Sequence, residues 1–504
     1  VTLEDIFSGT FRPKYYDINW ISDGEYLYQD QDTNLLVYNY ETGKTTVLLS
    51  DETFNEFEAS NYIISPDGKY ILLSTNYEKR WRHSYTASYY IYDLNTGDVE
   101  PVAPEESGNK IQYATWSPKG HKLAFVRDNN LYIQKLPSGP AIQITTDGKS
   151  NDIFNGIPDW VYEEEILSTD YALWWSPDGD FLAYLRFNDS EVPVIEYPFY
   201  TDDSQYPEDM EIKYPKAGDP NPTVKLFVVN LADGASVSEI PLPASLASGD
   251  YYITRVAWVT NERLAVQWLN RDQNISVLSL CDTASSTWNV VKNFEDSETG
   301  WVETFNPSLP VFPLDGLSYY LDISDRDGYK HLAYYELDGK EPIALTKGNW
   351  EVTNILGVDS KTDTVYFTAT EEGSGERHLY SISLKGGKTT LSCQLDSERC
   401  GYYSASFSPN AKYYILTYSG PGVPIQTLHS SNDTKELRTL EDNEALKKAL
   451  KNYQLPSKEF GKIKLADGIT LNYQMIKPAN FDPSKKYPVL FFVYGGPGSQ
   501  QVTK

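Results

Sequence analysis

A short phrase recurs along the first four-fifths of the chain, and it restricts the possible fold more than any other feature. Its clearest copies read Ser-Pro-Asp-Gly or a close variant, and a short apolar run follows each. The copies span residues 20–24, 64–68, 116–120 and 175–179, with weaker ones at 313–316 and 407–410. Proline presets a turn and glycine accepts the positive φ that closes it, so each copy predicts two strands joined by a tight turn.

The spacing of these copies indicates a repeat architecture. Most intervals are roughly 40 to 60 residues, in the range of a four-stranded propeller blade. The aromatic content is high, with 40 Tyr, 19 Phe and 11 Trp in 504 residues, and aromatic side chains suit half-buried pleated sheets. A propeller leaves only short, protected sheet edges, which keeps a long β chain soluble. The phrase alone leaves one alternative open, a set of unrelated hairpins in a β-sandwich.

Several segments depart from the repeat. Residues 191–221 are rich in Pro, Tyr and Asp, and they predict an arm inserted into a blade, either for a partner contact or as a solvent-exposed hairpin. The pattern changes near residue 435. Residues 437–452 predict a short amphipathic helix, and residues 460–476 predict strands around an Asp467-Gly468 turn. Residues 489–494 are apolar on both faces, which is typical of a strand inside a covered, largely parallel sheet.

The last segment carries part of a hydrolase pattern. The apolar run leads into a Gly-rich loop at 495–499, where an α/β-hydrolase places part of its oxyanion hole. No Gly-x-Ser-x-Gly elbow occurs, and all five histidines precede this segment, whereas the triad histidine follows the serine. A lone core strand would forfeit several kcal/mol of apolar burial. We therefore expect a chain truncated or nicked before the nucleophile, with the triad on a missing or separate C-terminal fragment.

Composition excludes some classes of function. The net charge of −28 argues against nucleic acid or an anionic membrane surface as a partner. No apolar run approaches the roughly 18 residues that a membrane helix needs, and no signal peptide is visible. The three cysteines, Cys281, Cys393 and Cys400, show no metal-ligand spacing. We expect neither a metal nor a cofactor.

The acidic run Asp159-Trp160-Val161-Tyr162-Glu163-Glu164-Glu165 has two possible explanations. Asp159 can cap a short helix whose dipole favours acids in the first turn. Alternatively, two adjacent glutamates flank one pocket, although three cannot share one helical face because successive residues point about 100° apart. Such carboxylates would bind a free peptide N-terminus, a cation below a pKa of roughly 8. That arrangement would make an exopeptidase.

Arg82 lies among aromatic residues in Trp81-Arg82-His83-Ser84-Tyr85. A guanidinium in this setting pairs with carboxylates or binds a carbonyl. The other explanation that the residues leave open is a stacked structural arginine.

These segments resemble the dipeptidyl peptidase IV family of prolyl oligopeptidase-type serine peptidases, which includes fibroblast activation protein. The specific matches are WRHSYTASY at 81–89 and DWVYEEE at 159–165. Further matches lie at 172–177, 191–193, 214–218, 428–431 and 487–497, and the resemblance runs from about Thr2 to the last residue. It implies a mainly β chain, an eight-bladed β-propeller followed by the beginning of an α/β-hydrolase domain. The implied division is an N-terminal segment at 1–14, a propeller at 15–435 and a hydrolase start at 436–504.

The resemblance also implies the activity and the roles of individual residues. The family releases dipeptides from N-termini with Pro or Ala in second place. Glu164 and Glu165 match the glutamates that hold the substrate amine, and Arg82 matches the arginine that contacts the substrate carbonyl. Tyr494 matches the oxyanion-hole tyrosine, and Phe305 matches an aromatic residue of the extended cleft. Asn306 departs from the pattern, because the mammalian enzyme has arginine there, and the Gly-rich loop also differs.

Cysteines and sequons carry further implications of the resemblance. The usual partners of Cys393 and Cys400 are replaced by Thr390 and Tyr418, so we predict that these two cysteines pair with each other. Cys281 has Val290 in place of its partner and is predicted to be free. Sequons lie at Asn188, Asn274 and Asn432, and the first two fall where relatives are glycosylated. We expect a secreted, non-vertebrate form, with the homodimer that is common in the family.

Three functional hypotheses remain. The first is a dipeptidyl peptidase in which this chain supplies the amine anchor and part of the oxyanion hole. The second is a non-catalytic family member that acts as a protein-interaction module. The joint presence of Arg82, Glu164, Glu165 and Tyr494 favours the enzyme. A prolyl tripeptidyl or acylaminoacyl peptidase, the third, fits the DWVYEEE phrase less well.

Overall fold

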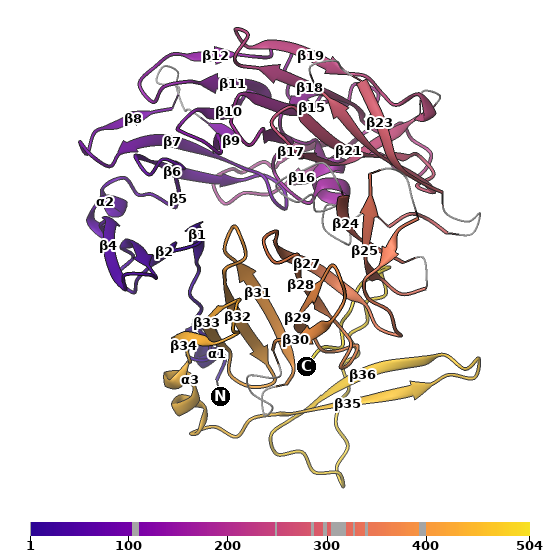
Figure 1. Cartoon of the computed structure of the whole chain (residues 1–504). Helices are drawn as coiled ribbons and strands as arrows, with labels where there is room; N and C mark the ends of the chain where they lie inside the picture. Colours follow the sequence, from indigo (N-terminus) through magenta and orange to yellow (C-terminus); the bar gives the residue numbers. More distant parts are fainter. Residues whose placement is uncertain are drawn as a thin grey trace.

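The computed structural model describes residues 2–102, 110–246, 249–283, 287–295, 300–303, 319–325, 328–337, 341–392 and 400–504. The chain is an eight-bladed β-propeller followed by a short C-terminal segment outside the blades (Figure 1). All strand pairs within the blades are antiparallel, and consecutive strands along the chain mostly pair with each other.

The first four blades occupy roughly the first half of the chain. Blade 1 contains β1 (Asn19–Ser22), β2 (Glu25–Gln29), β3 (Leu35–Asn39) and β4 (Lys44–Leu49). Blade 2 contains β5 (Asn61–Ile64), β6 (Tyr70–Lys79), β7 (Tyr85–Asp93) and β8 (Val99–Pro101). Blade 3 contains β9 (Ile111–Trp116), β10 (Leu123–Arg127), β11 (Asn130–Gln134) and β12 (Ala141–Gln143). Blade 4 contains β13 (Ile153–Asn155), β14 (Leu173–Trp175), β15 (Phe181–Asn188), β18 (Thr223–Asn230) and β19 (Ser236–Ile240).

The last four blades follow in the same order. Blade 5 contains β20 (Tyr251–Trp258), β21 (Arg263–Asn270), β22 (Ile275–Asp282) and β23 (Thr287–Glu295). Blade 6 shows β24 (Tyr319–Ser324), β25 (His331–Glu336) and β26 (Ile343–Ala344) within the described residues. Blade 7 contains β27 (Val352–Asp359), β28 (Thr364–Ala369), β29 (His378–Ser383) and β30 (Lys388–Thr390). Blade 8 contains β31 (Tyr402–Phe407), β32 (Tyr413–Gly420), β33 (Ile425–Ser430) and β34 (Glu436–Glu441).

The described copies of the recurring phrase form the turn between the first and second strands of blades 1, 2, 3 and 8, and the turn between β14 and β15 in blade 4. In blade 4, the N–H of Gly179 donates to the carbonyl of Ser176 at 2.8 Å, and Gly179 has φ of 72°. Ala411 holds the same place in blade 8, at φ of 54°, without the freedom of glycine. The copy at 313–316 lies outside the described residues. Blades 5 and 7 have other turn sequences at 259–262 and 360–363, which the phrase did not reveal.

Phrase turns of neighbouring blades are joined to each other. His121 of blade 3 lies 2.7 Å from Asp67 of blade 2, and Lys122 lies 2.7 Å from Asp180 of blade 4. The first and last copies also meet, because Asp23 accepts hydrogen bonds from the backbone and side-chain N–H groups of Asn410 at 2.9 and 3.0 Å. These contacts close the ring between blades 1 and 8.

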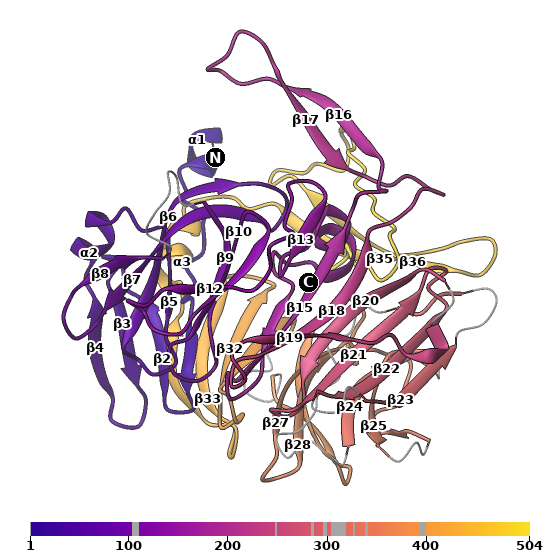
Figure 2. The same cartoon turned by 90° about the horizontal axis from the view of Figure 1, so that it is seen from above.

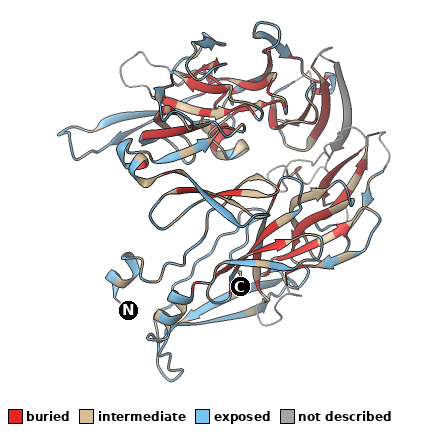
Figure 3. Ribbon diagram, turned by 60° about the vertical axis from the view of Figure 1, so that its left-hand side comes forward, coloured by how far each residue is buried: buried red, intermediate tan, exposed pale blue. Residues whose placement is uncertain are grey.

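The core lies between adjacent blades. In β10 and β15 successive side chains are buried on both faces of the sheet, because each blade is covered by its neighbours on either side. The largest continuous core cluster joins blades 3, 4 and 5, and it includes Tyr162, Phe187 and Trp268. Figure 3 shows the buried positions concentrated on the blade strands, whereas the two chain ends are exposed.

The predicted arm is present. β16 (Val194–Phe199) and β17 (Glu208–Lys213) form a separate two-stranded sheet between β15 and β18, and Figure 2 shows it projecting away from the blades. Its strands expose Val194, Ile195, Tyr197 and Phe199.

The chain from residue 436 onward corrects two expectations. The predicted helix at 437–452 is wrong in its first part, because Glu436–Glu441 pairs with β33 as the edge strand of blade 8, and helix α3 is Glu444–Leu450. The predicted hairpin is confirmed as β35 (Ser457–Lys464) and β36 (Thr470–Lys477). The predicted strand at 489–494 is not formed. That segment is irregular, and Leu490 is 93% exposed, because the described residues offer it no neighbouring strand to pair with.

The remaining helices are short. They are α1 (Leu3–Phe7), α2 (Asp51–Glu56), a π-helical turn η1 (Tyr162–Leu167) and a 3₁₀ turn η2 (Ala244–Leu246). The N-terminal residues lie against the start of the C-terminal segment, where Lys14 and Asn443 exchange two hydrogen bonds of 2.7 and 3.0 Å. Within the described ranges, no helix is both long and apolar enough to cross a membrane.

Candidate substrate-binding site

The acidic run begins with the predicted cap. Asp159 is fully buried, and its carboxylate accepts the backbone N–H groups of Val161 at 2.8 Å and Tyr162 at 3.4 Å. Burial raises the pKa of Asp159 to about 7, although these hydrogen bonds act in the opposite direction. The expected helix start is therefore confirmed, but residues Tyr162–Leu167 form a π-helical turn instead of an α-helix. π-helical turns are rare in proteins as a whole, but those that occur are frequently found at functional sites.

The three glutamates of this turn lie in three different environments. Glu163 is 1% exposed, and its Oε1 accepts the backbone N–H groups of His83 and Ser84 at 2.8 and 2.9 Å. Glu164 is half-buried and faces Arg82. Glu165 is exposed. The turn thus has one buried carboxylate and two that solvent or a ligand can reach.

Arg82 lies at the tip of the hairpin between β6 and β7, and its side chain pairs with Glu164. Its Nε lies 2.8 Å from each carboxylate oxygen, and its Nη2 lies 2.7 Å from Oε1. The hydrogen bond from Arg82 is the main cause that lowers the pKa of Glu164, and the same bond raises the pKa of Arg82. The Arg82 side chain is 67% exposed, so the pair contributes little to stability and stays accessible.

Topology explains why these segments meet. The tip at residues 80–84 lies at the end of β6 that is opposite its phrase turn, and the π-helical turn precedes β14, which leads into the phrase turn of blade 4. Both therefore lie at the same end of the blades. The structure pairs Arg82 with Glu164, and Glu165 lies close enough to interact electrostatically with the Arg82 guanidinium.

A pocket of about 360 Å³ opens beside Glu165. The Trp160 and Tyr214 rings, 4.7 Å apart, line it, and Tyr214 lies at the base of the arm. Asn221 donates to the Tyr252 hydroxyl at 2.6 Å in the same wall. The pocket thus combines aromatic surface with amide and carboxylate groups, which suits a peptide ligand.

The other predicted site residues lie elsewhere. Tyr494 is 62% exposed in the irregular C-terminal segment. Phe305 lies outside the described residues, as does Cys393. Cys281 is confirmed as a free, buried cysteine, and burial raises its pKa to about 12. Among the sequons, Asn432 is exposed, whereas the Asn188 and Asn274 side chains are half-buried and already accept local hydrogen bonds.

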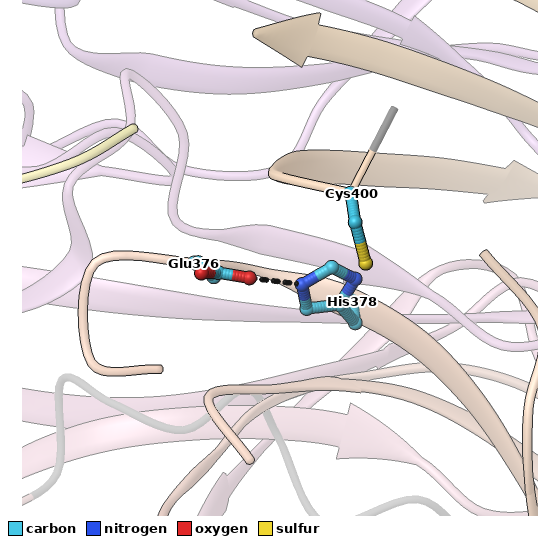
Figure 4. A group of neighbouring side chains, drawn as sticks. All are labelled: Glu376, His378 and Cys400. Carbon is cyan, nitrogen blue, oxygen red and sulfur yellow. Dashed lines mark hydrogen bonds and ion pairs between the residues drawn. The ribbon is translucent and has the colours of Figure 1, made fainter. Parts of the chain in front are cut away.

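A second cluster in blade 7 looks like a catalytic or metal site. His378 lies 2.8 Å from Glu376 and 3.1 Å from the Ser392 hydroxyl, with Cys400 beside it (Figure 4). However, His378 is fully buried, and Cys400 already has a partner. Blade 6 repeats the arrangement, since His331 lies 3.0 Å from the Thr346 hydroxyl, which also accepts the N–H of Leu332. The histidine and its hydroxyl partner are therefore a structural feature that blades 6 and 7 share.

Sequence reasoning did not single out Glu163 or Asp170 as site residues. Asp170 borders a small space shared with Glu163 and Trp81, and burial followed by the charge of Glu163 raises its pKa to about 6. The sequence signal that could have indicated these two residues was their position in the chain, because Glu163 belongs to the acidic run and Asp170 follows that run closely.

Comparison with known proteins identifies relatives along the whole chain. The family described as "Dipeptidyl peptidase IV (DPP IV) N-terminal region" matches residues 65–425. Human prolyl endopeptidase FAP is 49% identical over 514 residues, which cover 100% of this chain and 67% of that protein. Pig dipeptidyl peptidase 4 is 49% identical over 518 residues, with 99% and 67% covered. The crystal structure of dipeptidyl peptidase 4 from Porphyromonas gingivalis superposes with a TM-score of 0.90 at 38% identity, and the match covers 100% of this chain and 70% of that one.

The chain is an eight-bladed propeller with Glu164 and Glu165 clustered near the Arg82 guanidinium at one end of the blades. Peptidases match it along its length, so the fold and the site define a relative of the propeller-bearing peptidases. Within that class, the chain belongs to the dipeptidyl peptidase IV family.

Proposed function

We propose that this chain is the part of a serine exopeptidase that binds the substrate N-terminus, and that the enzyme releases N-terminal X-Pro or X-Ala dipeptides. Glu164 and Glu165 bind the substrate ammonium, and Arg82 contacts the neighbouring carbonyl. Tyr494 completes the oxyanion hole. The Ser, Asp and His of the triad come from polypeptide beyond these 504 residues, which contain no Gly-x-Ser-x-Gly elbow.

The observation that carries the proposal is the charge balance at the tip. Glu164 pairs with the accessible guanidinium of Arg82, and the exposed carboxylate of Glu165 interacts with the same guanidinium electrostatically, so these three side chains carry one excess negative charge. A single ammonium group matches that excess, and its three N–H donors can be shared between the two carboxylates. The pocket beside Glu165 adds aromatic surface for the first residues of a peptide.

Amine recognition accounts for exopeptidase specificity. When a substrate is bound through its terminal ammonium, each of its peptide bonds lies at a set distance from that ammonium. The distance then determines which peptide bond is cleaved. An N-acetylated peptide has no ammonium, and it would leave the excess negative charge unpaired.

The test uses the full-length protein and a chromogenic Gly-Pro substrate. Glu165→Gln and Glu164→Gln keep the side-chain shape and remove the charge, and each is expected to lower kcat/KM about 30-fold or more because a charge-assisted bond is lost. Glu239→Gln is the matched control, since Glu239 also pairs with an exposed cation, Lys225, at 3.0 Å, but in the edge strand of blade 4. Activity of both site variants within about threefold of wild type would refute the amine anchor.

We propose three further properties at the level of the whole protein. Cys393 and Cys400 form a disulfide, and Asn432, Asn188 and Asn274 are glycosylated in a secreted protein. The projecting arm contributes to a homodimer, because its exposed apolar side chains favour burial against a second copy. Mass analysis of the protein before and after glycosidase treatment tests the glycans, and sedimentation of an arm-deleted variant tests the dimer.

A further inference from the structure

We infer that Glu163 is a positioning residue of the amine site: through the backbone of His83 and Ser84 it holds the tip that carries Arg82 against Glu164. This inference deepens the proposed function and rests on it. Glu163 touches no substrate in this arrangement, because its side chain is 1% exposed.

The contact between Glu163 and the tip has the geometry of an anion in a nest of backbone amides. Two successive N–H groups, those of His83 and Ser84, converge on Oε1 at 2.8 and 2.9 Å. The N–H of Arg80 donates to the carbonyl of Ser84 at 2.9 Å, which closes the tip on itself. Glu163 therefore holds a loop whose own shape is already restricted, and Arg82 lies in the middle of that loop.

The π-helical turn is a rigid base for this contact. Tyr162 is fully buried, its ring lies 4.6 Å from that of Phe187, and its hydroxyl accepts the backbone N–H of Ile253 at 3.3 Å. These contacts attach the turn to blades 4 and 5. Because the turn is fixed, the carboxylate of Glu163 sets the position of the tip.

A cation also lies close to Glu163. The Arg80 guanidinium lies over the Trp81 ring at 3.9 Å and interacts electrostatically with Glu163. The Oε2 atom of Glu163 is buried and has no hydrogen-bond partner among the described residues. The carboxylate is thus held by two backbone donors and a nearby cation, and the loss of these donors would leave it poorly compensated.

The two contacts between turn and tip have different roles. The Arg82–Glu164 pair is accessible, and an exposed arginine gains little from one ion pair while it loses rotamer freedom. The buried Glu163 contact is screened from water. It can therefore fix the separation of the two segments, while the accessible pair remains available to rearrange around a substrate.

The test compares Glu163→Ala, Glu163→Gln, Arg82→Ala and the Glu163→Ala/Arg82→Ala double variant in the full-length protein. Glu163→Ala is expected to raise KM for a Gly-Pro substrate about tenfold with kcat changed less than about threefold. Glu163→Gln is expected to restore KM to within about threefold, because its amide oxygen accepts the same two N–H groups. The double variant should be no worse than Arg82→Ala by more than about twofold, since both changes act through one group.

Hydrogen exchange of the peptide that spans residues 80–84 gives an independent readout. The amides of His83 and Ser84 should exchange faster in Glu163→Ala and stay protected in Arg82→Ala. If Glu163→Ala fails to fold, Glu163→Asp replaces it, because it keeps the charge and shortens the reach, and the same KM and exchange changes are expected. Unchanged tip protection, or additive losses in the double variant, would overturn the inference. Activity of both Glu164→Gln and Glu165→Gln within about threefold of wild type would instead refute the amine anchor, whatever the exchange data show.

Discussion

The guanidinium Nε of Arg82 lies 2.8 Å from both carboxylate oxygens of Glu164, although 82 positions separate the two residues in the chain. The pair is accessible and joins blade 2 to the turn that precedes β14 of blade 4. An accessible ion pair adds little to the stability of a fold. The main effect of the Arg82–Glu164 pair is therefore to hold two charged groups in fixed positions on the surface.

The first prediction concerns the pH dependence of amine binding. Arg82 holds the pKa of Glu164 below its ordinary value, so Glu164 stays ionised as the pH falls. In Arg82→Ala that pKa rises. As the pH is lowered, the midpoint of the loss of Gly-Pro amide binding should therefore lie at a higher pH than in wild type. Calorimetric titration from pH 3 to 7 measures this midpoint. Arg438→Ala, which removes an arginine stacked on Tyr38, is the control, and equal midpoints in all three proteins would contradict the prediction.

The second prediction concerns stability and Asp159. Its folded-state pKa of about 7 is raised by burial above the unfolded value near 4, so the native state binds the extra proton. Its contribution is fully present below pH ~4 and is lost as the pH rises through about 7. Asp159→Asn keeps a capping oxygen and cannot ionise. The free energy of unfolding of Asp159→Asn, measured by urea unfolding, should increase relative to that of wild type by up to about 1.4 kcal/mol per pH unit between pH ~4 and about 7. Parallel pH curves would exclude this explanation.

The third prediction concerns closure of the propeller. Asp23→Ala removes the acceptor for two N–H groups of Asn410 and should lower the free energy of unfolding by about 1–3 kcal/mol. Hydrogen exchange should increase in β1 and β31, at the seam between blades 1 and 8. Asp67→Ala is the matched control, because Asp67 joins blades 2 and 3 through His121. Faster exchange at the seam in the control, or none in Asp23→Ala, would show that the ring closes by other contacts.

The fourth prediction concerns the cysteines. Native protein should not react with iodoacetamide at Cys281, which is fully buried and whose pKa burial raises to about 12. A non-reducing peptide map should show Cys393 linked to Cys400. Recovery of both as free thiols would refute that disulfide.

Local sequence predicted the blade turns well, because proline, aspartate and glycine act on the backbone within four residues. It found blades 1 to 4 and 8 through their phrases, and it missed the turns of blades 5 and 7, which use other residues. It also predicted helix where Glu436–Glu441 forms β34, since pairing with β33 outweighs the local helical pattern.

The sequence by itself determined the repeat, the arm and the helix start at Asp159, all of which depend on neighbouring residues. Only the tertiary structure decided how the acidic run is used. Glu163, Glu164 and Glu165 are chemically identical and adjacent, yet one is buried under the tip, one pairs with Arg82 and one is exposed. That division depends on the packing of blades 2 and 4 in the ring, which brings distant backbone amides and a guanidinium to one turn.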